Sequence, residues 1–342
     1  MWVDLFASLR DHARMFDKNA LEIDLEAEAN RICDAMRDAV KDLKKRGVVV
    51  GVSGGIDSST CIALATRALG PQKVQALLMP EKDSSSTSSD LGHMVCEHLK
   101  VSYEVEVISE ILEASGCYRR RDEAIREVFP EYDETYKQKI VLPPLAERER
   151  LNYYSIVVQS PQGEVKKARL PLKAYLQVVA STNFKQRTRK MLEYYHADRL
   201  NYAVIGTPNR LEYDQGFFVK GGDGLADIKP IAHLYKTQVY AMARHLGLPG
   251  PVVNSTPTTD TYSMDQGQDE FYFALPYDQM DLLLYALNHD IPAAQAGTPL
   301  GLTEEQVIWV YKDIQAKRRA TRYLHMPPVL VQKPEGLDVG RD

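Results

Sequence analysis

The sequence is poor in cysteine, in long apolar runs and in positive charge. Four cysteines occur in 342 residues, and none has the CxxC or Cys/His spacing of a metal site. No apolar run reaches the ~18–20 residues that a membrane-spanning helix requires. The 42 Lys and Arg residues are outnumbered by 47 Asp and Glu, and the net charge of −5 gives no general attraction to nucleic acid. We therefore expect neither a membrane nor a nucleic-acid partner.

The N-terminus lacks the features of a targeting segment. Asp4, Asp11 and Asp17 stand among its first residues, whereas signal and transit peptides are apolar or basic. The scattered cysteines are best explained as small buried hydrophobes in a reducing compartment. The sequence therefore predicts a cytoplasmic protein.

Short apolar runs alternate with helical patterns along most of the chain. The apolar runs predict strands at residues 48–52, 74–79, 101–108 and 202–205. Helical periodicity, often ended by Gly or Pro, predicts helices at residues 58–69, 184–197, 235–246, 278–288 and 304–317, and one that ends near residue 99. This order predicts an α/β fold with a doubly wound, mostly parallel, Rossmann-like sheet flanked by helices.

Additions are expected around this sheet. We predict an N-terminal helical segment, a central domain, and a C-terminal helical segment with a tail, at residues 1–46, 47–290 and 291–342. Within the central domain, residues 140–181 interrupt the alternation of strands and helices. Two apolar runs there, at 153–159 and 166–170, are separated by Ser-Pro-Gln-Gly, which is typical of a β-hairpin. We interpret this stretch as a hairpin insertion.

A glycine–serine loop between the first predicted strand and the next helix is the strongest local pattern. It consists of Gly51, Val52, Ser53, Gly54, Gly55, Ile56, Asp57, Ser58 and Ser59. Adjacent glycines let the backbone approach a ligand closely, and successive amides before a helix form a cradle for phosphate. Asp57 would repel a phosphate unless a cation such as Mg²⁺ lies between them. The alternative is a simple turn in which Asp57 caps the helix.

The loop is neither a Walker A sequence nor a dinucleotide-binding GxGxxG. It has no lysine, so a remote cation is expected to complete the site. Its residues resemble SGGxDS, the fingerprint of the N-type ATP pyrophosphatases. This resemblance implies cleavage of ATP between the α and β phosphates, transfer of AMP to an acceptor and release of pyrophosphate. GMP synthetase, asparagine synthetase, tRNA-modifying ligases and NAD synthetase share the motif, so other residues must identify the acceptor.

Two basic segments downstream supply candidate cations. In residues 183–189, Arg187 lies at the edge of an apolar helical face and Arg189 points further outward. Arg187 is therefore the better candidate for a cleft, and a solvated basic flank is the alternative. Lys236 stands in the first turn of a predicted helix, where a cation opposes the helix dipole unless a polyphosphate binds nearby. A surface lysine is the alternative to this remote cation.

A charged, glycine-rich loop follows the strand at residues 202–205. Ligands bind α/β sheets beyond the carboxyl ends of their strands, and this position favours a lid or substrate loop over packing. A solvated loop is the alternative. The polar residues of interest are Thr207, Glu212, Lys220, Asp223 and Asp227.

Together these segments resemble the NAD synthetase family. The family pattern NxKxRxR, GTxxxxE, GFFxKxGDGxAD and LxKxQ is matched in order from Asn183 to Gln238, and Pro257 to Asp260 resembles its PTxD segment. The resemblance covers most of the chain from about residue 30 to 290. The resemblance implies that the loop, with Thr207, Lys236 and Thr258, binds ATP. It implies that Asp57 and Glu212 hold Mg²⁺ and that Asp57 and Lys236 are catalytic. It also implies a homodimer that binds deamido-NAD through Arg187, Lys220 and Asp227.

The implied reaction is adenylation of the nicotinate carboxylate of deamido-NAD by ATP, followed by amination with ammonia to give NAD, AMP and pyrophosphate. We recognise no amidotransferase or nitrilase half, so ammonia would be free or come from a separate glutamine amidotransferase. Leu78-Met79-Pro80 replaces the Arg-Leu-Pro of some family members, and the basic segment near the C-terminus is only loosely echoed by Thr321 and Arg322. Two alternative functions are also compatible with the sequence: a paralogous ligase that aminates another carboxylate, and a catalytically silent nucleotide-binding protein.

Overall fold

A parallel sheet forms the centre of the molecule. The computed structural model describes residues 16–141, 154–255, 262–264, 272, 275–332 and 334–336. In this part of the chain the sheet has four strands in the order β3-β2-β1-β7, all parallel. The strands are β1 (Val48–Gly51), β2 (Val74–Leu78), β3 (Ser102–Val105) and β7 (Ala203–Ile205). β1, β2 and β7 are apolar and largely buried, as expected for strands covered on both faces. The predicted α/β fold is confirmed.

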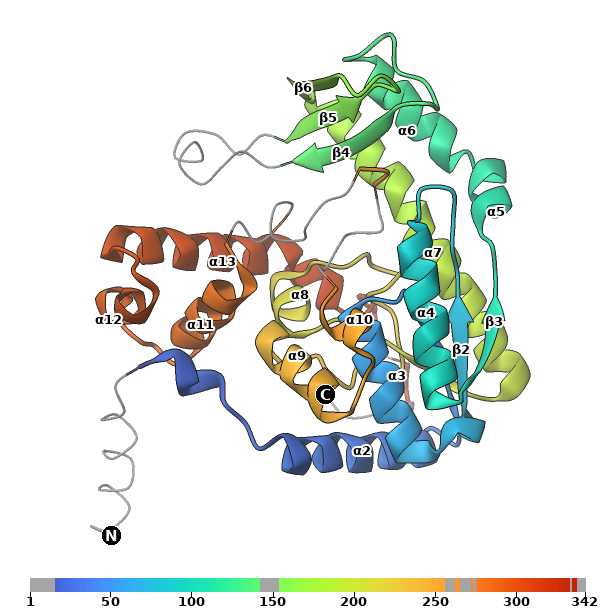
Figure 1. Ribbon diagram of the computed structural model, residues 1–342, viewed down its shortest axis with the longest axis vertical. Helices are drawn as coiled ribbons and strands as arrows, with labels where there is room; N and C mark the ends of the chain where they lie inside the picture. The colour runs from blue at the N-terminus through green and yellow to red at the C-terminus, as the bar shows by residue number, and fades with distance from the viewer. Residues whose placement is uncertain are drawn as a thin grey trace.

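Helices cover both faces of this sheet (Figure 1). The side chains of Val48 and Val50 pack on one face and that of Val49 on the other, because successive residues of a strand alternate. The first face is covered by α2 (Leu25–Asp42), α3 (Ile56–Leu69), α4 (Ser86–Leu99), α9 (Lys236–His245) and α10 (Gly250–Val253). The second face is covered by α5 (Ser109–Ala114), α6 (Cys117–Arg126) and α7 (Leu172–Leu200).

A second, antiparallel sheet differs from the predicted hairpin. Its strands are β4 (Lys137–Val141), β5 (Ser155–Gln159) and β6 (Val165–Arg169), in the order β4-β5-β6. The hairpin β5–β6 was predicted, whereas the strand β4 was not. Helix α7 begins at Leu172 rather than near Phe184, because Ala174 and Val178 of its first turns pack on this small sheet. Figure 1 shows the small sheet at one end of the molecule, beside α6 and the start of α7.

A helical group with its own apolar core lies beside α9, on the side away from the parallel sheet (Figure 1). It contains α11 (Tyr277–Asn288), α12 (Ala293–Gly297) and α13 (Glu304–His325). Helix α13 continues past the predicted end at residue 317, since Arg318 forms a two-point ion pair with Asp214, at 2.5 and 2.8 Å. The remaining short elements are η2 (Lys18–Leu21), η3 (Pro71–Lys73), α8 (Arg210–Gln215) and η6 (Thr298–Leu300).

Several expectations from composition can be compared with these elements. All four cysteines are free and buried, as predicted. Of the helices described, none has a stretch long and apolar enough to pass through a lipid bilayer. The division into regions 1–46, 47–290 and 291–342 stays a prediction.

Candidate functional site

The glycine–serine loop leaves the carboxyl end of β1 and leads into α3. Gly54 has a φ of +81°, and a Cβ at this position would lie 2.9 Å from Leu91 Cβ. Both facts require glycine there. The hydroxyl of Ser58 donates to Gly55 O at 3.1 Å and lies 3.3 Å from the hydroxyl of Ser53, which holds the two ends of the loop together. Helix α3 has no side-chain cap, so Asp57 does not play the capping role of the simple-turn alternative.

Asp57, Lys236 and Glu212 meet beside this loop, although they belong to α3, α9 and α8. Lys236 Nζ donates to Asp57 Oδ2 in an ion pair. The side chain of Lys236 is 0% exposed and that of Asp57 is 16% exposed. Lys236 lies in the first turn of α9, as predicted, but it is buried and paired with a carboxylate, so it is not the surface lysine of the alternative. Because Lys236 is not part of the cavity lining that the structure describes, its role as the remote cation of the phosphate site stays a prediction.

The electrostatics of these three residues favour a bound cation. Burial, together with the negative charge of Asp57, raises the pKa of Glu212 to about 8. Burial opposes the charged form of Lys236, but the carboxylates of Asp57 and Glu212 outweigh it and raise the pKa of its ammonium. With all three ionised, two carboxylates and one ammonium leave a net negative charge. Hard oxygen donors with this charge fit Mg²⁺.

Two residues that the sequence reasoning missed hold this group in position. Asn209 caps α8: its Oδ1 accepts from Leu211 N and Glu212 N at 2.9 and 3.2 Å, and its Nδ2 donates to Asp57 Oδ1 at 3.0 Å. Glu212 Oε2 accepts from Asn209 N at 3.0 Å, which completes a capping box. The Asn-x-x-Glu spacing was the signal that could have identified Asn209.

Asp281 of α11 is the second missed residue, and it anchors the start of α9. Its carboxylate accepts from the backbone amides of Lys236 at 3.2 Å and Thr237 at 2.7 Å. Asp281 is 0% exposed, and this burial raises its pKa to about 6. Because Asp281 lies 45 residues beyond Lys236 in the chain, no local sequence pattern links the two.

A cavity of about 1290 Å³ opens in front of the loop. Gly51 through Ser58 all line it, as do Thr207 and Glu212. Ser59 is 0% exposed inside α3; neither it nor Lys236 is part of the lining that the structure describes. Thr258 lies outside the described residues. The cavity exceeds the ~300–1,000 Å³ of a typical single-ligand pocket.

The three residues assigned to the second substrate differ in their placement. Arg187 and Lys220 both line the cavity, and Arg187 Nε donates to Lys220 O at 3.3 Å. Lys220 Nζ donates to Tyr323 O at 2.8 Å, at the end of α13. Asp227 is not among the described lining residues. Its carboxylate accepts from Val204 N at 2.7 Å and thereby ties the loop to β7.

Helix α7 carries a buried charged face that the helical wheel did not predict. Lys185 Nζ donates to Glu81 and Asp83, each at 2.7 Å, and Arg121 donates to Asp83 at 2.6 Å. These bonds fix the segment between β2 and α4, whose serines line the cavity. Arg189, which the wheel placed outward, also lines the cavity.

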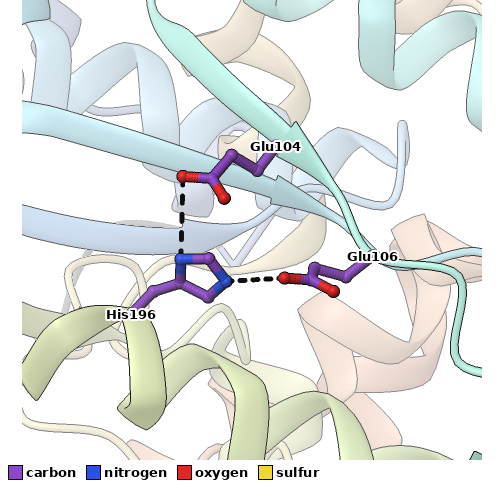
Figure 2. A group of neighbouring side chains, drawn as sticks. All are labelled: Glu104, Glu106 and His196. Carbon is purple, nitrogen blue, oxygen red and sulfur yellow. Dashed lines mark hydrogen bonds and ion pairs between the residues drawn. The ribbon is translucent and has the colours of Figure 1, made fainter. Parts of the chain in front are cut away.

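A separate cluster on the second face of the sheet contains Glu104, Glu106 and His196 (Figure 2). His196 Nε2 lies 2.9 Å from Glu106 Oε1, and Arg199 Nε donates to His196 Nδ1 at 3.0 Å. Because the guanidinium occupies the second ring nitrogen, both nitrogens already have partners. We interpret the cluster as a connection between α7 and the edge strand β3.

The parallel sheet, the glycine–serine loop and the acidic pair beside it define a nucleotide-dependent α/β enzyme of the ATP-pyrophosphatase class. A family model described as NAD synthase matches residues 28–129 and 144–322. The chain belongs to the NAD synthase family.

Individual relatives agree with this assignment. The NH3-dependent NAD+ synthetase of Rhizobium meliloti is 55% identical over 324 residues, which are 95% of this chain and 97% of the relative. That of Thermotoga maritima is 35% identical over 259 residues, 75% of this chain and 86% of the relative.

Solved structures share the fold at lower identity. The NH3-dependent NAD synthetase from Campylobacter jejuni has a TM-score of 0.60 at 22% identity, with 91% of this chain and 100% of that chain covered. The NMN synthetase from Francisella tularensis has a TM-score of 0.59 at 20% identity, with 92% and 100% covered. The fold is therefore shared by enzymes named for different products.

Proposed function

We propose that the protein is a ligase of NAD biosynthesis that adenylates deamido-NAD with ATP and then aminates it with ammonia. The observation that carries this proposal is the meeting of Asp57, Glu212 and Lys236 beside a loop whose backbone lines a large cavity. A catalytically silent nucleotide-binding protein would not need the buried carboxylate of Glu212 beside Asp57, where burial and the charge of Asp57 raise the pKa of Glu212. The names of the relatives support ammonia as the nitrogen donor.

The chemistry requires that a carboxylate oxygen become a leaving group. The loop amides from Ser53 to Ser58, at the start of α3, would hold the β and γ phosphates and stabilise the charge that develops on pyrophosphate. The nicotinate carboxylate then attacks the α-phosphorus, the bond to the bridging oxygen breaks, and pyrophosphate leaves. Ammonia attacks the acyl-adenylate, and AMP departs. The protein contributes mainly position and charge, and no covalent enzyme intermediate is needed.

Mg²⁺ is proposed to bind between Asp57 and Glu212. When bound, it would neutralise phosphate oxygens and act as a Lewis acid. Lys236 holds the side chain of Asp57 in position, because its buried ammonium forms an ion pair with that carboxylate. Its role is therefore positioning of the metal ligand rather than direct contact with the phosphates.

The second substrate is proposed to lie along α7. Arg187 and Lys220 line the cavity and supply positive charge for the pyrophosphate bridge of deamido-NAD. Asp227, by contrast, would act through the loop that it ties to β7. ATP would contact Thr207 on the opposite wall.

A homodimer is also proposed. Helix α7 exposes large apolar side chains near its two ends: Leu172 at 72% and Leu176 at 55%, and then Met191 at 54% and Tyr195 at 59%. Exposed apolar groups of this kind are typical of a protein–protein interface. Sedimentation of the wild type should give a dimer, and Met191→Lys with Tyr195→Lys should shift it toward the monomer. A wild type that sediments as a monomer would contradict this proposal.

The test of the function is release of pyrophosphate from ATP and Mg²⁺ in the presence of candidate acids. Release with deamido-NAD and ammonium supports the proposal. Release only with another carboxylate, such as nicotinate mononucleotide, would support the paralogous ligase. This alternative is included because an NMN synthetase has a similar fold. No release with any acid would support the silent protein. Replacing ammonium by glutamine with the purified chain tests whether a separate amidotransferase is needed.

A further inference from the structure

A buried ion pair of helix α7 lies at the start of the glycine–serine loop, and the reaction scheme above does not use it. Lys190 and Glu193 are 4% and 6% exposed, and both line the cavity. Lys190 Nζ donates to Glu193 Oε2 at 2.5 Å. A buried charge is costly unless it is paired, so Lys190 is what allows a carboxylate to lie at this position.

The second oxygen of Glu193 has no such partner. Among the residues that the structure describes, none donates a hydrogen bond to Glu193 Oε1. This oxygen lies against Gly51, where a Cβ would stand only 2.9 Å from it, so the glycine leaves room for the carboxylate. A buried acceptor that lines a cavity is placed to receive a hydrogen bond from a bound molecule.

The charges around Glu193 come from α7 and from the loop between α8 and α9. Burial raises the pKa of Glu193, the cations of Lys190 and Arg189 oppose this rise, and the carboxylate of Asp223 adds to it. On the side of the sheet, Gly51 and Met79 contribute no charge. A carboxylate oxygen repels the phosphates of ATP and the carboxylate of deamido-NAD, so this position suits a cation.

The proposed reaction includes a cation that has no assigned site. The proposed Mg²⁺ site uses Asp57 and Glu212, which leaves the nitrogen donor. At neutral pH ammonia is mostly present as ammonium, which has no lone pair with which to attack the acyl-adenylate. A base must therefore remove one proton before the C–N bond can form, and a buried carboxylate with a raised pKa is suited to this step.

We propose that Glu193 binds the ammonium ion through Oε1, next to Gly51, and takes one of its protons. This inference rests on the proposed function. After the proton passes to Glu193, the lone pair of ammonia forms the bond to the acyl carbon. The C–O bond to AMP breaks with its electron pair on the phosphate, and the surplus proton of the amide nitrogen passes to that phosphate. Lys190 is a positioning residue that holds the carboxylate.

The test separates the two half-reactions of the full chain. Exchange of labelled pyrophosphate into ATP, with deamido-NAD and without ammonium, reports adenylation alone. Glu193→Gln should leave this exchange and KM for ATP within about 2-fold of the wild type. Its kcat/KM for ammonium at neutral pH should fall ~100-fold, since a general base contributes ~10²–10⁴-fold. Asp198→Asn, at an exposed position of α7, is the matched control and should change neither half-reaction.

The pH dependence and a second nucleophile distinguish proton transfer from packing. The wild type should use total ammonium equally well between about pH 7.5 and 8.5, whereas the activity of Glu193→Gln should rise ~10-fold per pH unit with the fraction of free ammonia. Hydroxylamine is already neutral at these pH values, so Glu193→Gln should use it as well as the wild type does.

Three results for Glu193→Gln would overturn the proposal: unchanged use of ammonium, equal losses with ammonium and hydroxylamine, or a loss of exchange or of ATP affinity. A wild type whose activity follows free ammonia would also overturn it, and this measurement does not require the variant to fold. A wild type that shows no exchange with deamido-NAD would instead refute the proposed function.

Discussion

Replacing Glu212 by Gln should make the metal-free protein more stable while it destroys activity. Burial and the charge of Asp57 raise the pKa of Glu212 from 4.5 to about 8. Between these two pH values the folded protein keeps a proton that the unfolded chain has released. The free energy of unfolding of the wild type should therefore fall as pH rises from ~4.5 to ~8, and then level off.

The magnitude follows from the size of this shift. Each pKa unit corresponds to ~1.4 kcal/mol, so the ionised Glu212 costs up to ~5 kcal/mol of stability above pH 8. Gln keeps the oxygen that accepts from Asn209 N, but its amide adds a buried donor that costs ~1–3 kcal/mol if unpaired. We expect Glu212→Gln to be ~2–4 kcal/mol more stable than the wild type at pH 9, and the difference to vanish or reverse at pH 5.

Urea denaturation at a series of pH values, without and with MgCl2 and a non-hydrolysable ATP analogue, measures this effect. Metal and nucleotide should stabilise the wild type most at high pH, since binding of the cation displaces the proton of Glu212, and should stabilise Glu212→Gln little. Glu97→Gln, on the exposed surface of α4, is the control. It should change neither the pH dependence of the free energy of unfolding nor the stabilisation by metal and nucleotide. The reasoning is refuted if Glu212→Gln is no more stable than the wild type at pH 9.

Asp57→Asn should abolish pyrophosphate release, by at least 100-fold, with an unchanged circular dichroism spectrum; retained activity would remove Asp57 from the metal site. Arg187→Ala should raise KM for deamido-NAD ~10-fold and leave KM for ATP nearly unchanged, and equal changes in steady-state kinetics would contradict its placement. Gly54→Ala should reduce ATP affinity and lower stability by ~1–3 kcal/mol, because φ is +81° there. Calorimetric titration and thermal melting check this, and wild-type values for both would contradict it.

Local sequence patterns were sufficient to predict much of the central sheet and of the glycine–serine loop. The run Val48–Gly51 is too apolar for anything but a strand buried on both faces, and the glycines after it allow the positive φ at Gly54. These features depend on neighbours in the chain, so pattern and stereochemistry were sufficient to predict the strand, the loop and the helix α3. The role of Glu212, by contrast, was implied by the family resemblance, and its capping box with Asn209 was missed although it is a local motif.

Only the tertiary structure decided how distant residues meet. The wheel for α7 assumed that apolar residues face inward, yet Lys185 is 1% exposed and Tyr195 is 59% exposed. Lys185 can be buried because Glu81 and Asp83, about a hundred positions earlier, neutralise it. Likewise, Lys236 contacts Asp57 because Asp281 fixes the start of α9. The cost of burying a charge depends on its partners in space, and the order of residues along the chain does not contain that information in any local pattern.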